Sequence, residues 1–259
     1  MKQTALVTGA TSGIGREFAD LLAAAGCDLV LVARDQARLD DCAASCSARY
    51  KINAQTIAAD LSDPASPQAI FDQVRTTPVS ILINNAGFGV YGPFAETNLD
   101  RELELLQVNM VSLTHLTKLF LKPMLDRREG RILNVASTVA FQPGPRLSLY
   151  SASKAFVYSF TCALALELKG TGVTATVLCP GGTRTEFQKR AGMEKAGAFN
   201  AAGFEPMSAR RVAEIGCQAM FEGNPVAVAG WKNKLMVVVS KRLPTLWSAR
   251  VAGNLNRDR

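Results

Sequence analysis

Tyr150 and Lys154 stand four residues apart in a segment with a helical pattern, and together they could move a proton to or from a substrate. Residues at i and i+4 share one face of a helix, so the Lys154 ammonium can lie close to the Tyr150 phenol. A free tyrosine has a pKa near ~10, and a neighbouring positive charge lowers that pKa. The pair therefore favours general acid/base catalysis, although the same spacing also occurs by chance on many helices.

Ser137 follows the apolar segment 131–136, which has the length and composition of a strand, and it precedes Tyr150 by thirteen residues. A strand end and the helix after it can bring a hydroxyl and a phenol to one site. We therefore expect Ser137 and Tyr150 to act on the same substrate atom.

A glycine-rich turn, TGATSGIG at residues 8–15, follows the first predicted strand and opens a helix. Glycines allow a tight turn and a close approach of backbone amides to a pyrophosphate, while the helix N-terminus offers unpaired N–H groups to an anion. The spacing is G-x-x-x-G-x-G, and its place between strand and helix favours nucleotide binding over a purely structural turn.

Strand-like and helical patterns alternate along most of the chain, which predicts a parallel sheet with helices on both faces. Pro64 marks the start of a further helix, and residues 183–207 break the rhythm, as a lid or binding loop often does. The strand-like segments are residues 4–7, 28–32, 55–58, 79–83, 131–136, 173–178 and 226–229, and the helical patterns cover 14–25, 36–49, 99–126, 149–169 and 208–222.

Composition and cysteine use indicate a cytoplasmic protein. Of the 259 residues 48% are apolar, enough for a full core, and no segment reaches the ~18 uninterrupted apolar residues of a membrane span. The N-terminus lacks the pattern of a signal peptide, and the six cysteines lack metal-site spacing, so reduced thiols are expected. His115 is the only histidine, which argues against a histidine-based triad and against most metal sites, so no metal is expected.

The net charge of +7 is concentrated in the last 29 residues. Residues 231–259 carry seven basic residues and one acidic residue, a charge of +6, which leaves +1 for residues 1–230. The net charge is therefore no argument for nucleic-acid binding by the whole protein, and no nucleic-acid partner is expected. The tail mixes apolar and basic residues around Pro244, so we expect two short helices that pack over a cleft or a subunit neighbour, with attachment to an anionic membrane surface as the alternative.

The chain resembles the short-chain dehydrogenase/reductase family over about residues 4–230. The motifs are TGxxxGxG, NNAG at residues 84–87, Asn109, Ser137, YxxxK at 150–154 and Pro180-Gly181. The resemblance implies a single Rossmann-type doubly wound domain over residues 1–230, with residues 231–259 as a basic extension packed on it. It also implies a nicotinamide cofactor and the interconversion of a carbonyl and an alcohol, in a branch close to NADP-dependent 3-oxoacyl and hydroxysteroid reductases, and a dimer or tetramer is expected.

The resemblance also implies a role for each of four catalytic residues. Tyr150 would give a proton to the carbonyl oxygen, and Lys154 would bind the nicotinamide ribose and hold Tyr150 near its phenolate form. Ser137 would donate a hydrogen bond to the substrate oxygen, where negative charge develops. Asn109 would hold a water that links Lys154 to solvent, or it is a helix-interior residue bonded to the backbone.

Cofactor contacts are implied along the same edge of the sheet. The glycine turn would bind the phosphates, residues 60–61 the adenine, residues 85–87 the adenosine side, and residues 180–185 the nicotinamide carboxamide. The full set is Gly9, Thr11, Ser12, Gly13, Ile14, Gly15, Arg34, Asp60, Leu61, Asn85, Ala86, Gly87, Tyr150, Lys154, Pro180, Gly181, Thr183 and Thr185.

The choice between NADP and NAD depends on the end of the second strand. NAD-binding relatives carry an acidic residue there, whereas this chain has Ala33 followed by Arg34, and an arginine can pair with a 2′-phosphate. Asp35 is the competing ribose ligand, but its position favours a cap on the next helix. Many NADP-binding relatives carry a basic residue where this chain has Ser12, a departure from the pattern. We predict NADP(H).

The substrate is expected to be an apolar ketone, because the segments that could line it are rich in apolar side chains. A catalytically silent NADP-binding sensor or interaction protein is the alternative, and the intact Ser137/Tyr150/Lys154 set argues against it. The apolar candidates are Phe88, Val90, Tyr91, Phe94, Phe141, Leu147, Phe187, Met193 and Phe199.

Overall fold

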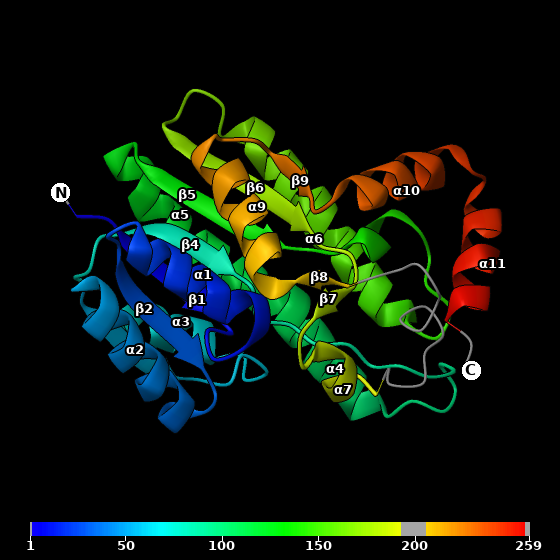
Figure 1. Ribbon diagram of the computed structural model, residues 1–259, viewed down its shortest axis with the longest axis horizontal. Coiled ribbons are helices and arrows are strands. Elements are labelled where there is room, and N and C mark those ends of the chain that lie inside the picture. Colours follow the sequence, from blue (N-terminus) through cyan, green and yellow to red (C-terminus); the bar gives the residue numbers. More distant parts are fainter. Residues whose placement is uncertain (1, 193–205, 257–259) are drawn as a thin grey trace.

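Seven parallel strands form the central sheet of the protein (Figure 1), whose computed structural model describes residues 2–192 and 206–256. The strand order is β3-β2-β1-β4-β5-β6-β9, which confirms the predicted parallel α/β fold. The strands are β1 (Thr4–Thr8), β2 (Asp28–Ala33), β3 (Ala54–Ala58), β4 (Val79–Asn84), β5 (Gly130–Val135), β6 (Val173–Cys179) and β9 (Val226–Val228).

Helices cover both faces of the sheet and form one apolar core on each side (Figure 1). Along β1, Ala5 and Val7 belong to the first core and Leu6 to the second, as the two-residue period of a strand requires. The first core contains α1 (Gly13–Ala24), α2 (Gln36–Tyr50) and α9 (Ala209–Phe221), and the second contains α3 (Ser66–Gln73), α5 (Leu113–Arg127) and α6 (Ser148–Glu167).

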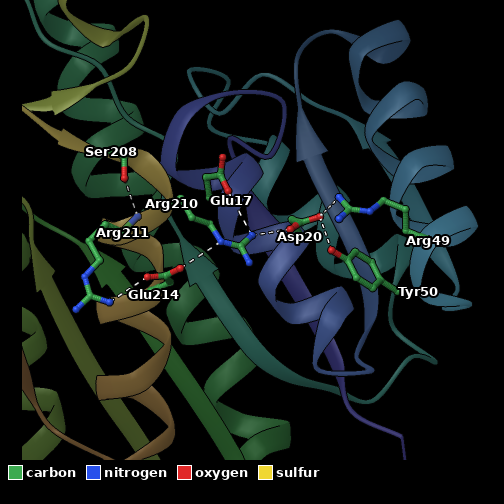
Figure 2. Close-up of polar contacts among 8 residues, drawn as sticks. All are labelled: Glu17, Asp20, Arg49, Tyr50, Ser208, Arg210, Arg211 and Glu214. Atoms are coloured by element: carbon green, nitrogen blue, oxygen red, sulfur yellow. Dashed lines mark hydrogen bonds and ion pairs between the residues drawn. The ribbon is translucent and has the colours of Figure 1, made fainter.

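Figure 2 shows a network of ion pairs that joins α1, α2 and α9 at the surface of the first core. Arg210 Nη1 lies 2.5 Å from Asp20 Oδ2 and 3.4 Å from Glu17 Oε2. Asp20 Oδ1 also accepts hydrogen bonds from Arg49 Nη1 at 3.1 Å and from Tyr50 Oη at 2.9 Å. The side chains of Arg210 and Arg49 are 40% and 62% exposed, and ion pairs with exposed partners contribute about 1 kcal/mol or less each, so the network adds only modestly to the packing of α9 on α1.

The strand order reverses between β1 and β4, and this is the point of the sheet where a ligand site is expected. The chain leaves β1 toward β2 on one side and leaves β4 toward β5 on the other, so the loops diverge at the carboxyl ends of these strands. The loops after β5 and β6 begin at the same edge of the sheet as those after β1 and β4, because all four strands are parallel.

Three local predictions differ from the structure. The helix expected to start at Pro64 starts at Ser66, with Pro67 in its first turn, where a missing N–H costs nothing. The helical pattern over 99–126 is divided into α4 (Leu99–Leu106), a π-helical turn η1 (Gln107–Ser112) and α5. The ends of segment 183–207 are regular: β7 (Thr183–Arg184) pairs with β8 (Met207–Ser208), and α7 (Phe187–Arg190) follows β7.

Candidate active site

A cavity of about 850 Å³ opens at the carboxyl ends of the strands, where the strand order reverses. Its size lies in the upper part of the range of about 300–1,000 Å³ that ligand pockets occupy. Of the predicted catalytic and cofactor-binding residues, all of which the structure describes, only Gly15 and Asn109 do not line it. Those that do are Gly9, Thr11, Ser12, Gly13, Ile14, Arg34, Asp60, Leu61, Asn85, Ala86, Gly87, Ser137, Tyr150, Lys154, Pro180, Gly181, Thr183 and Thr185.

The glycine turn between β1 and α1 has the backbone geometry that its sequence requires. Gly9 has φ +67° and Gly13 has φ +54°, in the left-handed region that glycine adopts without a steric penalty. Gly15 lies behind the cavity, where an added Cβ would stand 2.2 Å from the Gly9 carbonyl oxygen. Gly15 therefore allows α1 to pack directly on the turn, and the first two residues of α1, Gly13 and Ile14, line the cavity.

Thr8 joins the glycine turn to the loop after β4, a role that the sequence did not reveal. Its Oγ1 accepts hydrogen bonds from the backbone N–H groups of Asn85 and Ala86, both at 3.0 Å. Asn85 Nδ2 donates in return to the Thr8 carbonyl at 2.9 Å. The two loops that face the cavity are therefore fixed relative to each other.

Ser137, Tyr150 and Lys154 meet on the floor of the cavity. Ser137 follows β5 with an extended backbone and forms a hydrogen bond with Tyr150. Tyr150 and Lys154 both lie in the first turns of α6. Lys154 Nζ lies 5.8 Å from the centre of the Tyr150 ring and donates to the Val135 carbonyl at 2.8 Å. Ser137 Oγ also lies 3.4 Å from the Pro180 carbonyl oxygen, a long hydrogen bond that a better acceptor can replace.

The pKa of Tyr150 moves in the opposite direction to the prediction. Burial raises the pKa of Tyr150 to about 12, and the hydrogen bond with Ser137 offsets only part of this. Burial lowers the pKa of Lys154 to about 8, because the ammonium is as deeply desolvated as the phenol. The expectation that Lys154 lowers the Tyr150 pKa was therefore wrong for this arrangement: Tyr150 keeps its proton at neutral pH, which suits a proton donor.

Asn109 lies in the π-helical turn η1, and π-turns within helices are frequent at functional sites. Its side chain is fully buried, with Nδ2 donating to the Phe88 carbonyl at 3.1 Å and to Ser153 Oγ at 3.0 Å. Its Oδ1 accepts from the Phe88 N–H at 3.2 Å. A Cβ on Gly87 would stand 2.8 Å from Asn109 Oδ1 and 3.3 Å from Lys154 Nζ, so Asn109 lies beside Lys154, and its role in a proton relay stays a prediction.

The end of β2 places a cation where a ribose phosphate could lie. Arg34 lines the cavity, its side chain is two-thirds exposed, and its Nη1 lies 3.9 Å from Asp60 Oδ2. Arg38 also lines the cavity and donates from Nη2 to the Thr11 carbonyl at 3.2 Å. Asp35 Oδ1 accepts from the Arg38 N–H at 3.1 Å, which confirms the prediction that Asp35 caps α2.

The other end of the cavity is apolar. Phe88, Leu147 and Phe187 line it as predicted, and the rings of Tyr150 and Phe187 lie 5.4 Å apart between centres. Of the other residues predicted for the substrate side, Val90 and Tyr91 pack against these apolar side chains, and Phe94 is exposed. Phe141 contacts Tyr158 and lies outside the cavity lining. Met193 and Phe199 fall outside the described residues.

The two C-terminal helices complete this apolar end, which sequence reasoning did not resolve residue by residue. Met236 comes from α10 (Trp231–Arg242), and Ala252, Leu255 and Asn256 come from α11 (Thr245–Leu255) and its end. Asn256 Nδ2 donates to the Pro145 carbonyl at 3.0 Å, which holds the end of α11 near the cavity. A helical pattern alone does not say which neighbour a terminal helix covers, so only the general expectation of packing over a cleft could be made.

Comparisons with known proteins agree with this geometry. A sequence model of the family described as short chain dehydrogenase matches residues 3–196. The very-long-chain 3-oxoacyl-CoA reductase of Phaeosphaeria nodorum is 41% identical over 178 residues, which cover 65% of this chain and 51% of the relative. The bovine (Bos taurus) very-long-chain 3-oxoacyl-CoA reductase is 31% identical over 256 residues, 96% of this chain and 78% of the relative. The chain thus spans from about half to about three quarters of the length of these relatives.

A solved structure shows the same arrangement of elements. The short-chain dehydrogenase from Sphingobium yanoikuyae in complex with NADPH is similar with a TM-score of 0.83 and 32% sequence identity, and the match covers 93% of each chain.

Proposed function

The chain belongs to the short-chain dehydrogenase/reductase family of oxidoreductases, and from this premise we propose that it uses NADP(H) to interconvert a carbonyl group and a secondary alcohol on an apolar substrate. The proposal depends chiefly on one observation: Ser137, Tyr150 and Lys154 converge on the floor of a cavity that has a glycine turn at one end and apolar side chains at the other.

The glycine turn fits the pyrophosphate of a dinucleotide. An added Cβ at Gly9 would stand 2.8 Å from Asn85 Nδ2 and 3.1 Å from Ala86 Cα, so this cavity-lining position has no room for a side chain and its backbone stays bare. The N-terminus of α1 adds unpaired N–H groups, and its first turn contains no acidic residue that would repel a phosphate. With the dinucleotide held in this way, its nicotinamide would supply or accept the hydride.

Tyr150 and Ser137 act on the substrate oxygen in the proposed reduction. The Ser137 hydroxyl turns from the Pro180 carbonyl to the substrate oxygen and stabilises the negative charge that develops there. Tyr150, protonated because burial raises its pKa to about 12, donates its proton to that oxygen. In the oxidative direction the same phenol takes the proton back.

Lys154 and Asn109 support this proton transfer. With burial lowering its pKa to about 8, Lys154 can exchange a proton near neutral pH and return one toward Tyr150. We assign Lys154 the ribose hydroxyls as a further contact. Asn109, whose amide is held by Phe88 and Ser153, would position the water that links Lys154 to solvent.

The preference for NADP(H) over NAD(H) is supported by Arg34 and Arg38 at the end of β2. Both guanidinium groups border the cavity, Ala33 occupies the position of the usual acidic residue, and Asp35 is engaged in capping α2. A guanidinium can bind a 2′-phosphate in a bidentate manner.

The apolar end of the cavity supports a bulky apolar ketone as the substrate, such as a 3-oxoacyl thioester or a steroid-like ketone. Phe88, Leu147 and Phe187 offer contact area, and Ser137 and Tyr150 supply hydroxyl groups in the same cavity. Three further points stay predictions: the division into residues 1–230 and 231–259, a homo-oligomer, and a cytoplasmic location.

A substrate panel tests the proposed function. Purified protein is mixed with NADPH or NADH and with aliphatic ketones, 3-oxoacyl thioesters or steroid ketones, and cofactor consumption is followed. We expect turnover with NADPH, higher kcat/KM for long apolar ketones than for short polar ones, and much lower kcat/KM with NADH. Tight NADPH binding without turnover on any substrate would instead favour the silent sensor.

A further inference from the structure

The C-terminal arm, defined as α10, α11 and the turn between them (residues 231–256), carries apolar side chains on its solvent side. On α10 Trp231, Leu235 and Val238 recur at i, i+4 and i+7, so they form one stripe along the helix. All three are exposed, and Trp231 is 72% exposed. The opposite side of the helix holds the buried Asn233 and Val237.

The second helix of the arm repeats this arrangement. Trp247 and Val251 are exposed and lie one turn apart on α11, with Leu246 beside them. Ser248 and Ala252 occupy the buried side of the helix. Figure 1 shows both helices at one extremity of the molecule, beyond the edge strand β9. Two solvent-facing apolar stripes therefore lie on one projecting element.

Closure of the cavity does not explain these stripes. The arm contributes Met236 and Ala252 to the cavity, from the side of each helix that faces the protein. A helix that only covers a core has one apolar side and a polar opposite side. Here the outer side is apolar as well, with both tryptophans on it, so a binding partner on the solvent side is required to explain it.

The charges around the stripes restrict that occupant. Residues 231–256 contain five cations and no aspartate or glutamate. Lys241, near the C-terminal end of α10, is engaged with the body of the protein: its Nζ lies 3.3 Å from Tyr158 Oη and 4.9 Å from the centre of the Phe141 ring. The remaining cations are exposed and flank the apolar side chains; they are Lys232, Lys234, Arg242 and Arg250. The surface thus combines apolar and purely basic character.

We propose that the outer side of the C-terminal arm docks on an anionic membrane surface. Its aromatic and aliphatic side chains would enter the boundary between headgroups and acyl chains, with the flanking cations paired to lipid phosphates. Self-pairing of the arm between two copies would set five cations against five, which opposes a dimer through this face. Within the described part of the chain no helix has the length and apolar character of a membrane span, so the contact is at the surface.

Vesicle co-sedimentation of the full chain tests the proposal. The probes are phosphatidylcholine vesicles with and without phosphatidylserine, at low and high salt. We expect binding to the anionic vesicles that weakens as salt screens the cations. The triple variant K232E/K234E/R242E should lose about 100-fold or more in affinity for the anionic vesicles. W231S/W247S should lose binding as well, because the apolar contact is removed.

The control is Leu166→Ser, which changes an equally exposed apolar residue (76% exposed) on α6, outside the arm. L166S should bind vesicles like the wild type, and all variants should keep their NADPH affinity, since none of the changed side chains lines the cavity. Equal binding to neutral and anionic vesicles, or unchanged binding in the arm variants, overturns the proposal. The proposal is also overturned if the wild type does not bind vesicles and its molecular mass in solution is twice that of W231S/W247S, because a second copy of the chain then covers this face.

Discussion

The two walls of the cavity are built in different ways. The glycine-turn wall consists of strand ends and the loops directly after them, tied together by Thr8 and packed so closely at Gly15 that one methyl group would not fit. The C-terminal wall consists of Met236, Ala252, Leu255 and Asn256, on helices that lie at the edge of the sheet. In the proposed mechanism the first wall holds the reacting groups in position, whereas the second offers apolar area that can change without disturbing them.

The largest effect is expected where the first wall meets the chemistry. Tyr150→Phe removes the proposed proton donor and keeps the ring, so kcat should fall by about 10²- to 10⁴-fold while KM changes little. Steady-state kinetics with NADPH and the best ketone of the panel measure this. Leu255→Ala on the C-terminal wall is the matched comparison and should mainly raise KM. Near-normal turnover of Y150F contradicts the assigned mechanism.

Alanine at two helical glycines compares the tightness of the two walls. Gly15→Ala and Gly253→Ala each gain up to about 1 kcal/mol of helix propensity. At Gly15 the new Cβ would stand 2.2 Å from a backbone oxygen, so the free energy of unfolding should fall by about 3 kcal/mol and NADPH binding should weaken. At Gly253 the nearest atom is Pro145 Cγ at 3.2 Å, and stability should change by about 1 kcal/mol or less. Urea unfolding of both variants decides, and equal losses would remove the distinction between the walls.

Burial of Lys154 predicts a dependence of stability on pH. Its pKa is about 8 in the folded protein, below the reference value of 10.5, so the folded state binds fewer protons than the unfolded state between these values. The Lys154 contribution to the free energy of unfolding is therefore fully present above the reference pKa of 10.5. It is lost as pH falls from there through about 8, a change of about 1–3 kcal/mol.

Urea unfolding of wild type and Lys154→Met at pH 7 and pH 10 measures this contribution. The difference in stability between the two proteins should shift in favour of wild type at the higher pH. Tyr150 has the opposite effect: because its pKa is raised, its contribution to the free energy of unfolding decreases with rising pH, and only above about pH 10. If the free energies of unfolding of the two proteins change with pH in parallel, Lys154 does not titrate in this range and the prediction is wrong.

The smallest effect concerns cofactor choice. Arg34→Asp removes the cation that we assign to the 2′-phosphate, so the Kd for NADPH should rise about tenfold or more while NADH is affected less. Leu255→Ala, on the other wall, should leave both cofactor affinities unchanged. Fluorescence titration with each cofactor measures the four constants. An unchanged NADPH affinity in R34D would place the phosphate elsewhere.

The glycine-turn wall could be predicted from the sequence because its residues follow strands in short motifs. Gly9 and Ser137 lie just after strands, Gly13 opens the helix that follows the first of them, and parallel strands bring their carboxyl ends to one edge. Thr8 was missed as a site residue because its role depends on hydrogen bonds to a loop 77 residues away. The pKa of Tyr150 was misjudged because a helical spacing reveals the charge at i+4 but not the burial of both groups.

The C-terminal wall could not be predicted residue by residue. An amphipathic pattern identifies α10 and α11 as helices, but their neighbours depend on the docking of a terminal segment, which involves few local constraints. Met236 and Val237 look alike in sequence, yet only Met236 borders the cavity. The same limit concealed the outward position of Trp231 and Trp247.

The most direct test of the proposed function follows the hydride itself. The wild-type protein is given NADPH carrying deuterium at the transferable position of the nicotinamide, with the best ketone of the panel, and the product is analysed by mass spectrometry. We predict an alcohol with one deuterium on the former carbonyl carbon, formed far more slowly by Tyr150→Phe. NADPH that binds in the cavity but transfers no deuterium to any ketone of the panel would contradict the account.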